Sequence, residues 1–305
     1  MSLPPIALNL TYPDEKVMET YIAMAASMGI KRMSVDAVTL AKMTESPEFA
    51  RQIRRSAEAH SISFFDAHAP HAPIDSLGNP YPGGVEHSTG VMLRSLHAAA
   101  EAGMKILTMH TARTRLVGNY APETGPIMDV DLDGAVERTL RQLDILIPEA
   151  EKLGLIIALE NIVLPSSTAE HIMRILERAR HPHLGLCYDA GHALIMEKQP
   201  DKDLTKIAGW IRCGWPEDTV VCQEDQLDIM LNDIVTTHLH DNDGHGDLHL
   251  LPGDGIADWQ KITERLKRAP RLLSLQSEVE HNALTADFAR TLRQFRAAGF
   301  PVTGE

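Results

Sequence analysis

The sequence predicts an α/β protein that folds as a single-domain (β/α)8 barrel, the TIM barrel, and three observations lead to this fold class. Short apolar runs alternate with longer helical patterns along the 305 residues, and eight such runs are found. Parallel strands need crossover helices, so strict alternation restricts the fold to a doubly wound sheet or a closed barrel, and eight units in this length favour the barrel. No glycine-rich dinucleotide-binding turn follows the first run, which leads instead into Thr11-Tyr12-Pro13.

The eight strands are expected to be short and apolar because a parallel strand is buried on both faces. They are predicted at Ile6–Leu10, Arg32–Val35, Ile62–Ala67, Lys105–Met109, Leu155–Leu159, Leu184–Tyr188, Ile234–Leu239 and Leu272–Gln276. Between them, apolar residues recur every three to four positions, which is typical of helices that bury one face. Helices are predicted around residues 17–28 and 136–147 and at Glu86–Ala102, Ser167–Ala179, Trp259–Leu266 and Thr285–Phe295.

Polar and glycine residues mark the helix ends. Side chains that can accept a hydrogen bond from the first turn stand where N-caps are needed, at Asp14, Ser46, Ser167 and Asp258. Glycine can adopt the left-handed conformation that closes a helix. Glycines stand at the predicted C-terminal ends, at Gly29, Gly103, Gly154 and Gly299.

Two stretches break this rhythm within the one domain, 1–305. A long loop is predicted over residues 69–88, which are rich in proline, and an insertion at about 208–225, with Trp210 and Trp215, interrupts the helix after the sixth strand. Active sites of barrels are built from the loops that follow the strands, so these two stretches are candidate walls of a site. The second could equally be a lid or a contact in a homo-oligomer, and the sequence leaves that open.

Charge and cysteine content exclude several classes of protein. With 29 Lys and Arg against 42 Asp and Glu, the net charge of −13 argues against broad adhesion to nucleic acid or to an anionic membrane. Three irregularly spaced cysteines, Cys187, Cys213 and Cys222, are too few for a disulfide framework or a cysteine zinc site. No signal peptide or membrane-spanning apolar stretch is visible, so a cytoplasmic protein is expected.

Carboxylates and imidazoles end six of the predicted strands on the same side of the barrel. A single such residue is usually solvated, but charged groups that converge on one low-dielectric mouth repel each other unless a cation lies between them. A divalent metal centre explains the pattern, and mixed carboxylate and imidazole donors suit Mn²⁺, Mg²⁺, Co²⁺ or Zn²⁺. The residues are Asp66, His68, His110, Glu160, Asp189, His192, His238, His240 and Glu278, followed in the loop after the seventh strand by Asp247 and His249.

Several strings of residues resemble a known family, the xylose-isomerase-like barrels. They are Ala-Leu-Glu160-Asn, Cys-Tyr-Asp189-Ala-Gly-His192, Thr-His238-Leu-His-Asp241-Asn and Asp247-Leu-His249-Leu-Leu-Pro-Gly-Asp-Gly. The resemblance extends from His68 to Glu278. This family holds sugar and sugar-phosphate isomerases and epimerases, inosose-type dehydratases and endonuclease IV-type nucleases.

The resemblance implies one divalent metal held by four residues, Glu160, Asp189, His238 and Glu278. The last strand leaves a choice, because Gln276 and Glu278 lie on the same strand face and either could be the counterpart of the family's glutamate. We choose Glu278 because only Glu278 is anionic.

By the same resemblance, the expected activity is a metal-dependent isomerase or epimerase of a sugar, a sugar phosphate or a keto-inositol. Glu160 and Glu278 would move the proton through a metal-stabilised enediolate, and His192 would bind a substrate hydroxyl. Asp247 and His249 would orient His238 or hold a sugar oxygen. Two alternatives share this site: a dehydratase that expels a β-hydroxyl from a related polyol, and a non-catalytic sugar-binding relic. Arg113 and Arg115 are the only nearby candidates for binding a phosphate.

A nuclease is the remaining alternative. His68, His110, His192, Asp247 and His249 match additional ligands of the nuclease branch, whose centre would hold more than one Zn²⁺. Against it, Asp189-Ala-Gly-His192 differs from the Thr-Cys pair usual in those enzymes, and His240 stands where they carry Asn. The loops offer few Arg and Tyr residues to grip a duplex. The expected partner is therefore a small sugar or polyol and not a nucleic acid.

Overall fold

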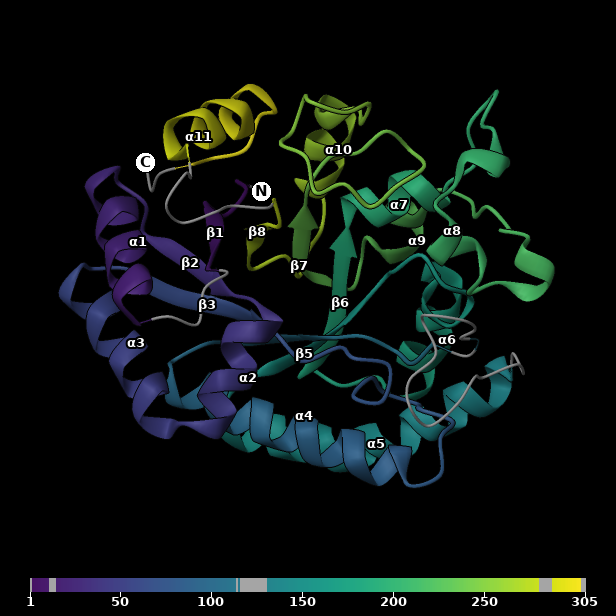
Figure 1. The fold of residues 1–305 in the computed structure, drawn as a ribbon, viewed down its shortest axis with the longest axis horizontal. Helices are drawn as coiled ribbons and strands as arrows, with labels where there is room; N and C mark the ends of the chain where they lie inside the picture. The colour runs from purple at the N-terminus through teal and green to yellow at the C-terminus, as the bar shows by residue number, and fades with distance from the viewer. Residues whose placement is uncertain (1, 11–14, 114, 116–130, 280–286, 303–305) are drawn as a thin grey trace.

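The computed structural model describes residues 2–10, 15–113, 115, 131–279 and 287–302, and within them eight parallel strands close into one barrel (Figure 1). Each strand pairs with its neighbours in chain order, and β8 closes the barrel against β1. The chain therefore folds as the predicted TIM barrel. The strands are β1 Ile6–Leu10, β2 Arg32–Val35, β3 Ser63–His68, β4 Ile106–Met109, β5 Ile156–Glu160, β6 Leu184–Asp189, β7 Ile234–Leu239 and β8 Leu275–Ser277.

Helices surround the barrel and bury its outer face (Figure 1). The α-helices are α1 Glu15–Ser27, α2 Ala37–Glu45, α3 Pro47–Ala59, α4 Gly84–Glu101, α5 Leu132–Leu153, α6 Ala169–Arg178, α7 Ala190–Met196, α8 Gly209–Arg212, α9 Gln226–Met230, α10 Trp259–Leu266 and α11 Phe288–Ala297. The described residues also form three short 3-10 helices, which are η2 Pro165–Ser167, η3 Leu204–Lys206 and η4 Pro216–Asp218. No helix in the described part of the chain is long and apolar enough to cross a membrane.

Three strands, β1, β2 and β7, have the predicted bounds, and the others differ in an informative way. Strands β3, β5 and β6 continue one residue further than predicted, to His68, Glu160 and Asp189. The run of apolar residues ends one position earlier, but the hydrogen-bonded strand pairing continues to these three residues. Their polar side chains are themselves buried in the barrel mouth. Strand β8 begins at Leu275 rather than Leu272, since the preceding residues lie outside its ladder with β1 and β7.

Two of the predicted N-caps are confirmed and one is wrong. Ser46 accepts a hydrogen bond from Phe49 N at the start of α3, and Asp258 caps α10. Ser167 lies inside η2, and its neighbour Thr168 caps α6, because the 3-10 turn delays the start of the helix. Asp14 lies outside the residues that the structure describes. The four predicted C-terminal glycines all have positive φ: Gly29, Gly103, Gly154 and Gly299.

The two irregular stretches are loops of different kinds. The loop after β3 ends at Gly83, whose φ of 72° starts α4, so residues 84–88 are helical rather than part of the loop as predicted. The stretch 208–225 forms α8 and η4 with irregular turns between α7 and α9. Both follow strands at their carboxyl ends, where they flank the barrel mouth.

The barrel interior is packed below the mouth. Ile106, Ala158, Cys187 and Val235 form an apolar layer inside the barrel. Buried Asp66 accepts hydrogen bonds from the hydroxyls of Thr236 and Ser274, at 2.7 and 3.0 Å. A filled interior leaves only the carboxyl ends of the strands to receive a ligand.

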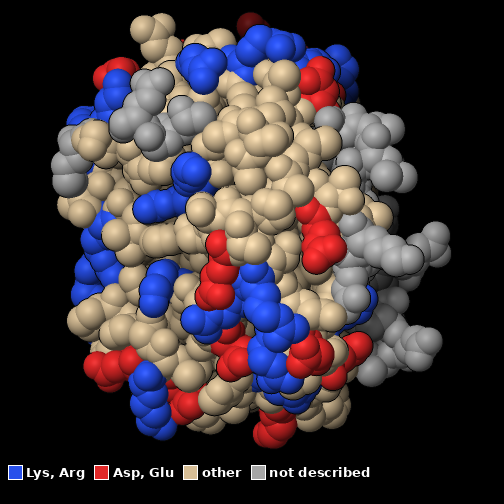
Figure 2. All heavy atoms as spheres, turned by 90° about the vertical axis from the view of Figure 1, so that its left-hand side faces the viewer, with Lys and Arg blue, Asp and Glu red and all other residues tan. Residues whose placement is uncertain are grey.

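Surface charge is mixed on the side formed by α1 and α3. Basic and acidic side chains are interspersed over the lower part of this face (Figure 2). On α3, Arg51 and Arg55 pair with Glu48, and Arg54 pairs with Glu58. These exposed pairs neutralise each other locally, which is typical of a solvated surface rather than a nucleic-acid interface.

Candidate metal centre

The polar residues at the strand ends converge on one site at the barrel mouth. Alternation along each strand turns every second side chain inward, so the last inward positions of β3 to β8 meet. His68 is 5% exposed, Glu160 is 1% exposed, and Asp189 and His238 are fully buried. Asp66, which the sequence also placed at the mouth, lies below it and pairs with Thr236 and Ser274. The structure brings together the nine residues to which the sequence gives a metal-binding or catalytic role: His68, His110, Glu160, Asp189, His192, His238, Asp247, His249 and Glu278.

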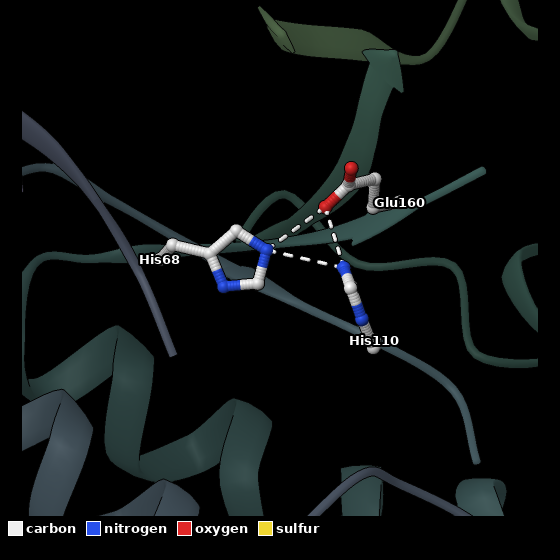
Figure 3. A group of neighbouring side chains, drawn as sticks. All are labelled: His68, His110 and Glu160. Carbon is white, nitrogen blue, oxygen red and sulfur yellow. Dashed lines mark hydrogen bonds and ion pairs between the residues drawn. The ribbon is translucent and has the colours of Figure 1, made fainter. Parts of the chain in front are cut away.

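The first cluster joins β3, β4 and β5 (Figure 3). The Nε2 atoms of His68 and His110 are 3.1 Å apart, and they lie 3.1 and 3.0 Å from Oε2 of Glu160. Donors in a tetrahedral zinc shell, with bonds of about 2.0–2.1 Å, are about 3.3 Å apart. The three donor atoms thus have nearly the spacing that one small divalent ion requires.

The second cluster surrounds His238 on β7. Its Nδ1 lies 3.0 Å from Oε1 of Glu160, 3.1 Å from Oε2 of Glu278 and 3.8 Å from Oδ2 of Asp189. Oε2 of Glu278 makes no hydrogen bond among the described residues despite its burial. A buried carboxylate oxygen without a donor is costly, and a cation among these groups would relieve it.

The two candidate residues of the last strand, Gln276 and Glu278, lie at different depths in the barrel. Gln276 is fully buried and lies in register with His238, one layer below the mouth. Glu278 lies two residues further on, beside Nδ1 of His238, and lines the cavity. Of the two residues, Glu278 is therefore the one positioned to join the cluster.

The third cluster is built by α7 and the loop after β7. Asp247 lies between two histidines, with Oδ2 3.4 Å from Nε2 of His192 and Oδ1 3.3 Å from Nε2 of His249. Asp189 accepts a hydrogen bond from His192 N at 2.6 Å and so caps α7, which sets the position of His192. His249 has a φ of 47°, an uncommon conformation for a residue with a side chain, and such strain is concentrated at functional sites.

Backbone carbonyls orient three of the histidines in the same way. Nδ1 of His68 donates to Ala69 O at 2.6 Å, and Nδ1 of His249 donates to Glu278 O at 2.5 Å. Nδ1 of His192 donates to Asn161 O at 3.1 Å. Since a carbonyl can only accept, each Nδ1 carries a proton, and each Nε2 faces the site. Metal-binding histidines are typically held by such a hydrogen bond on the nitrogen that does not bind the ion.

The carboxylates and several imidazoles of the site hold each other in their charged forms. Burial raises the pKa of Glu160, but the positive charge of His238 and the hydrogen bond from His110 outweigh it and hold that pKa well below its ordinary value. Burial lowers the pKa of His192, but Asp189 and Asp247 raise it well above the ordinary histidine value. The pKa of His249 is raised to about 10, because Asp247 and Glu278 outweigh burial. Without an ion, the carboxylates are charged and these imidazoles hold protons.

Metal affinity is therefore expected to fall steeply with decreasing pH. An ion held by Glu160, Asp189, His238 and Glu278 must displace a proton from His238, because the neighbouring Glu160 and Glu278 raise the pKa of that imidazole well above its ordinary value despite burial, whereas the carboxylate of Glu160 has no proton to lose. The dissociation constant should rise about tenfold per pH unit for each proton displaced. Competition with a chromophoric chelator at pH 6, 7 and 8 measures it, and calorimetry in buffers of different ionisation enthalpy counts the protons. A dissociation constant that is independent of pH would contradict this charge distribution.

Cys187 lies within reach of Glu160 and His238 and could in principle be a further ligand. Burial raises the pKa of the Cys187 thiol to about 12, so an ion would bind this sulfur only by displacing its proton. Cys187 also packs with Ile106, Ala158 and Val235 in the apolar layer inside the barrel.

Sequence reasoning missed one histidine of the site, His71, and gave a second, His240, no individual role. The ring of His71 lies 5.0 Å from that of His68 and 4.9 Å from that of His110, and it lines the cavity. Nε2 of His240 lies 3.1 Å from Oδ2 of Asp189, and its ring stacks on that of His249 at 4.1 Å. The spacing of two residues from His238 places His240 on the same strand face, a signal that the sequence carried.

Gly191 is required beside His240. A Cβ atom at Gly191 would lie 2.0 Å from Cε1 of the His240 ring. Glycine at this position thus lets the first turn of α7 approach β7 closely, which brings His192 and Asp189 toward the loop after β7.

A cavity of about 130 Å³ opens above the clusters. Its floor is formed by the histidines and carboxylates, and its wall by apolar residues of the loop after β5 together with Trp210 and Arg113. Pockets for drug-sized ligands are typically about 300–1,000 Å³, so this cavity suits a small molecule. The lining residues are His68, His71, His110, Arg113, Glu160, Ile162, Val163, Leu164, His192, Trp210, Asp247, His249 and Glu278.

Comparison with known proteins adds the following. Residues 22–295 match the family described as xylose isomerase-like TIM barrel. The structure of 3-keto-D-glucoside 4-epimerase YcjR from E. coli has a TM-score of 0.67 and 15% identity, over 98% of this chain and 99% of that chain. A D-psicose 3-epimerase, solved in the presence of D-fructose, has the same TM-score and identity, over 98% of this chain and 100% of that chain.

A match in sequence is shorter. The uncharacterized protein y4fM of Sinorhizobium fredii (strain NBRC 101917 / NGR234) is 32% identical over 114 residues, which are 36% of this chain. The match spans 29% of the length of that relative.

Proposed function

The chain belongs to the xylose isomerase-like TIM barrel family, and from this premise we propose that it is a divalent-metal-dependent isomerase or epimerase of a sugar, a sugar phosphate or a related polyol ketone. One observation carries the proposal. Two carboxylates from different strands, Glu160 and Glu278, lie 3.0 and 3.1 Å from one nitrogen of His238. The similar solved structures are of sugar epimerases by their printed names, which supports a sugar as the substrate class.

Four residues would hold the ion: Glu160, Asp189, His238 and Glu278. Their oxygen and nitrogen donors suit Mn²⁺, Mg²⁺, Co²⁺ or Zn²⁺. The chemistry supplied by a bound ion is polarisation of the substrate carbonyl, which makes the neighbouring C–H bond more acidic.

Glu160 and Glu278 are the proton-transfer groups in this proposal. Glu160 comes from β5 and Glu278 follows β8, so the two carboxylates reach a small substrate from different sides. Both carboxylates are ionised at neutral pH, because the charge of His238 keeps the pKa of each below its ordinary value despite burial. One removes the proton from the carbon next to the carbonyl, and the other returns a proton to the same or the opposite face.

His192 would bind a substrate hydroxyl. It lines the cavity, and the neighbouring Asp189 and Asp247 favour its protonated form, which can donate a hydrogen bond from Nε2. Asp247 and His249 would hold the loop after β7 in place and could take a sugar oxygen.

Isotope exchange tests the proposal directly. The metal-loaded protein is expected to exchange a substrate C–H proton with deuterated water for at least one ketose or keto-inositol, as loss of one proton NMR signal. Metal-stripped protein is the control and should give no exchange. A dehydratase would exchange and also release water. A protein that binds sugars but exchanges no proton would be a sugar-binding relic and would refute the enzymatic proposal.

A second candidate, hydrolysis of phosphodiesters at a centre with more than one Zn²⁺, is favoured by one observation. The first and third clusters provide donors beyond the four that one ion needs, namely His68 and His110, and His192, Asp247 and His249. An abasic-site duplex therefore belongs in the same assay. Cleavage at catalytic protein concentrations, with more than one zinc per chain, would replace the first proposal by the second.

A further inference from the structure

A layer of polar side chains lies directly beneath the metal centre inside the barrel. In a TIM barrel, alternate strands contribute the four side chains of one interior layer. Strands β2, β4 and β8 contribute the fully buried residues Ser34, Thr108 and Gln276, and Cys187 of β6, which also packs on the apolar residues below, is the fourth. The strand register sets this layer against the site, since Gln276 is paired with His238.

Three of these residues have buried polar atoms without a hydrogen-bond partner. Oγ of Ser34, Oγ1 of Thr108 and both side-chain polar atoms of Gln276 make no hydrogen bond to any residue that the structure describes. Buried polar atoms are almost always paired, and internal water is a common partner where no side chain reaches them. Serine, threonine and cysteine are smaller than the branched residues that commonly fill such a layer, so this layer offers both space and partners to water.

One nitrogen of His238 also lacks a partner. Nδ1 lies against the carboxylates of Glu160 and Glu278, so an ion bound there leaves a proton on Nε2. Nε2 is buried and has no acceptor within the described part of the chain. The thiol of Cys187 is within reach, but sulfur is only a weak acceptor. A metal-binding histidine almost always donates its second N–H, and three other histidines of this site donate to carbonyls.

We propose that Gln276 is a positioning residue for His238 and that ordered water in the polar layer joins the two. The water accepts the proton of His238 Nε2 and donates to Oε1 of Gln276, and the hydroxyls of Ser34 and Thr108 are its further partners. This arrangement fixes the imidazole ring so that the lone pair of Nδ1 points at the ion. The proposal deepens the proposed function and rests on its metal centre.

An amide suits this position because it is polar but uncharged. Oε1 of Gln276 accepts and Nε2 donates, so the side chain can take a hydrogen bond that originates at His238 and donate another to a neighbouring hydroxyl. A carboxylate at the same depth would add negative charge beneath Glu160 and Glu278, and an aliphatic side chain would leave the imidazole N–H unpaired. Glutamine therefore orients His238 without changing the charge of the site.

Replacing Gln276 by methionine tests the proposal, because methionine has a similar length and volume but no amide. The dissociation constant for Zn²⁺, measured by competition with a chromophoric chelator, should rise about 10- to 100-fold. Zinc-loaded protein with ¹⁵N-labelled histidine should show an imidazole N–H signal that exchanges slowly with water, and Gln276→Met should lose this signal. If Gln276→Met does not fold, Thr108→Val removes another partner of the water and should raise the same dissociation constant by about twofold or more.

The matched control is Thr237→Val. Thr237 precedes His238 on β7, and its hydroxyl is likewise buried without a partner among the described residues. Its side chain points to the opposite face of the strand, away from the polar layer. The dissociation constant for Zn²⁺ and the imidazole N–H signal should both remain as in the unmodified protein.

Three outcomes would each overturn the proposal. If Gln276 has no partner, Gln276→Met should raise the melting temperature of the metal-free protein and leave the affinity for Zn²⁺ unchanged. If Gln276 only supports the fold, that melting temperature should fall while the affinity and the N–H signal stay unchanged. If the thiol holds the ring instead, Cys187→Ala and not Gln276→Met should weaken Zn²⁺ binding. None of these measurements needs a substrate, so failure here leaves the proposed function to its own test by proton exchange.

Discussion

Replacing Glu278 by glutamine is expected to abolish proton exchange while preserving the fold and much of the bound metal. Glutamine has nearly the shape of glutamate but cannot accept the proton, and the loss of a positioned base typically costs about 10²–10⁴ in rate. The exchange rate by proton NMR and the metal content by elemental analysis are the two measurements. Glu224→Gln is the matched control, because Glu224 is exposed and pairs with Lys198 away from the cavity.

The companion variant Gln276→Glu tests the strand-eight choice. Gln276 lies one layer below Glu278, so a carboxylate there should disturb metal affinity without restoring exchange to Glu278→Gln. If Gln276 rather than Glu278 were the functional residue of the last strand, Glu278→Gln would leave the proton-exchange rate nearly unchanged. A fully active Glu278→Gln protein would refute the role proposed for Glu278.

Replacing His238 by alanine is expected to release the metal. His238 is fully buried, and its Nδ1 lies 3.0 Å from Glu160 and 3.1 Å from Glu278. Without His238, the ion loses one ligand, and the carboxylates of Glu160 and Glu278 lose a positive partner between them. The affinity for the metal should therefore fall by about 100-fold or more. The unmodified protein should retain close to one divalent ion per chain after dialysis, and His238→Ala should retain almost none.

His183→Ala is the matched control for this experiment. His183 precedes β6 at the opposite end of the barrel, where its Nδ1 bonds to Leu155 O at 2.6 Å. Its loss should leave the metal content unchanged. Bound metal should also raise the melting temperature of the unmodified protein, since a ligand at 100 times its dissociation constant stabilises by about 2.7 kcal/mol. Absence of metal from protein that has been supplemented with Mn²⁺ and Zn²⁺ would refute the metal-dependent proposal.

Much of the fold could be predicted because its determinants are local. The apolar runs that form β1, β2 and β7 have the predicted bounds, and the glycines predicted to end helices have positive φ. Alternation of strand and helix then dictates parallel pairing, and parallel pairing brings all carboxyl ends to one mouth. The convergence of Glu160, Asp189 and His238 therefore follows from sequence order alone, without any knowledge of individual contacts.

Other features depended on contacts between distant parts of the chain. The stretch 208–225 has no periodicity that predicts its shape. It is held by hydrogen bonds to residues far away in the sequence, since Arg115 donates to Cys213 O and Trp215 Nε1 donates to Val163 O. The contact of Arg113 with the ring of Trp210 arises in the same way, between residues far apart in the sequence.

The choice between Gln276 and Glu278 shows most clearly where prediction from the sequence ends and where the tertiary structure is needed. A period of two determines that both side chains point into the barrel, and the sequence can determine no more than that. Depth along the barrel axis depends on the register of β8 against β7, which places Gln276 level with His238 and carries Glu278 up to the cavity. The sequence by itself determined the fold, the end of the barrel that carries the site and the residue types that meet there. Only the tertiary structure decided which of them touch, because register and loop position are set by packing among all eight strands.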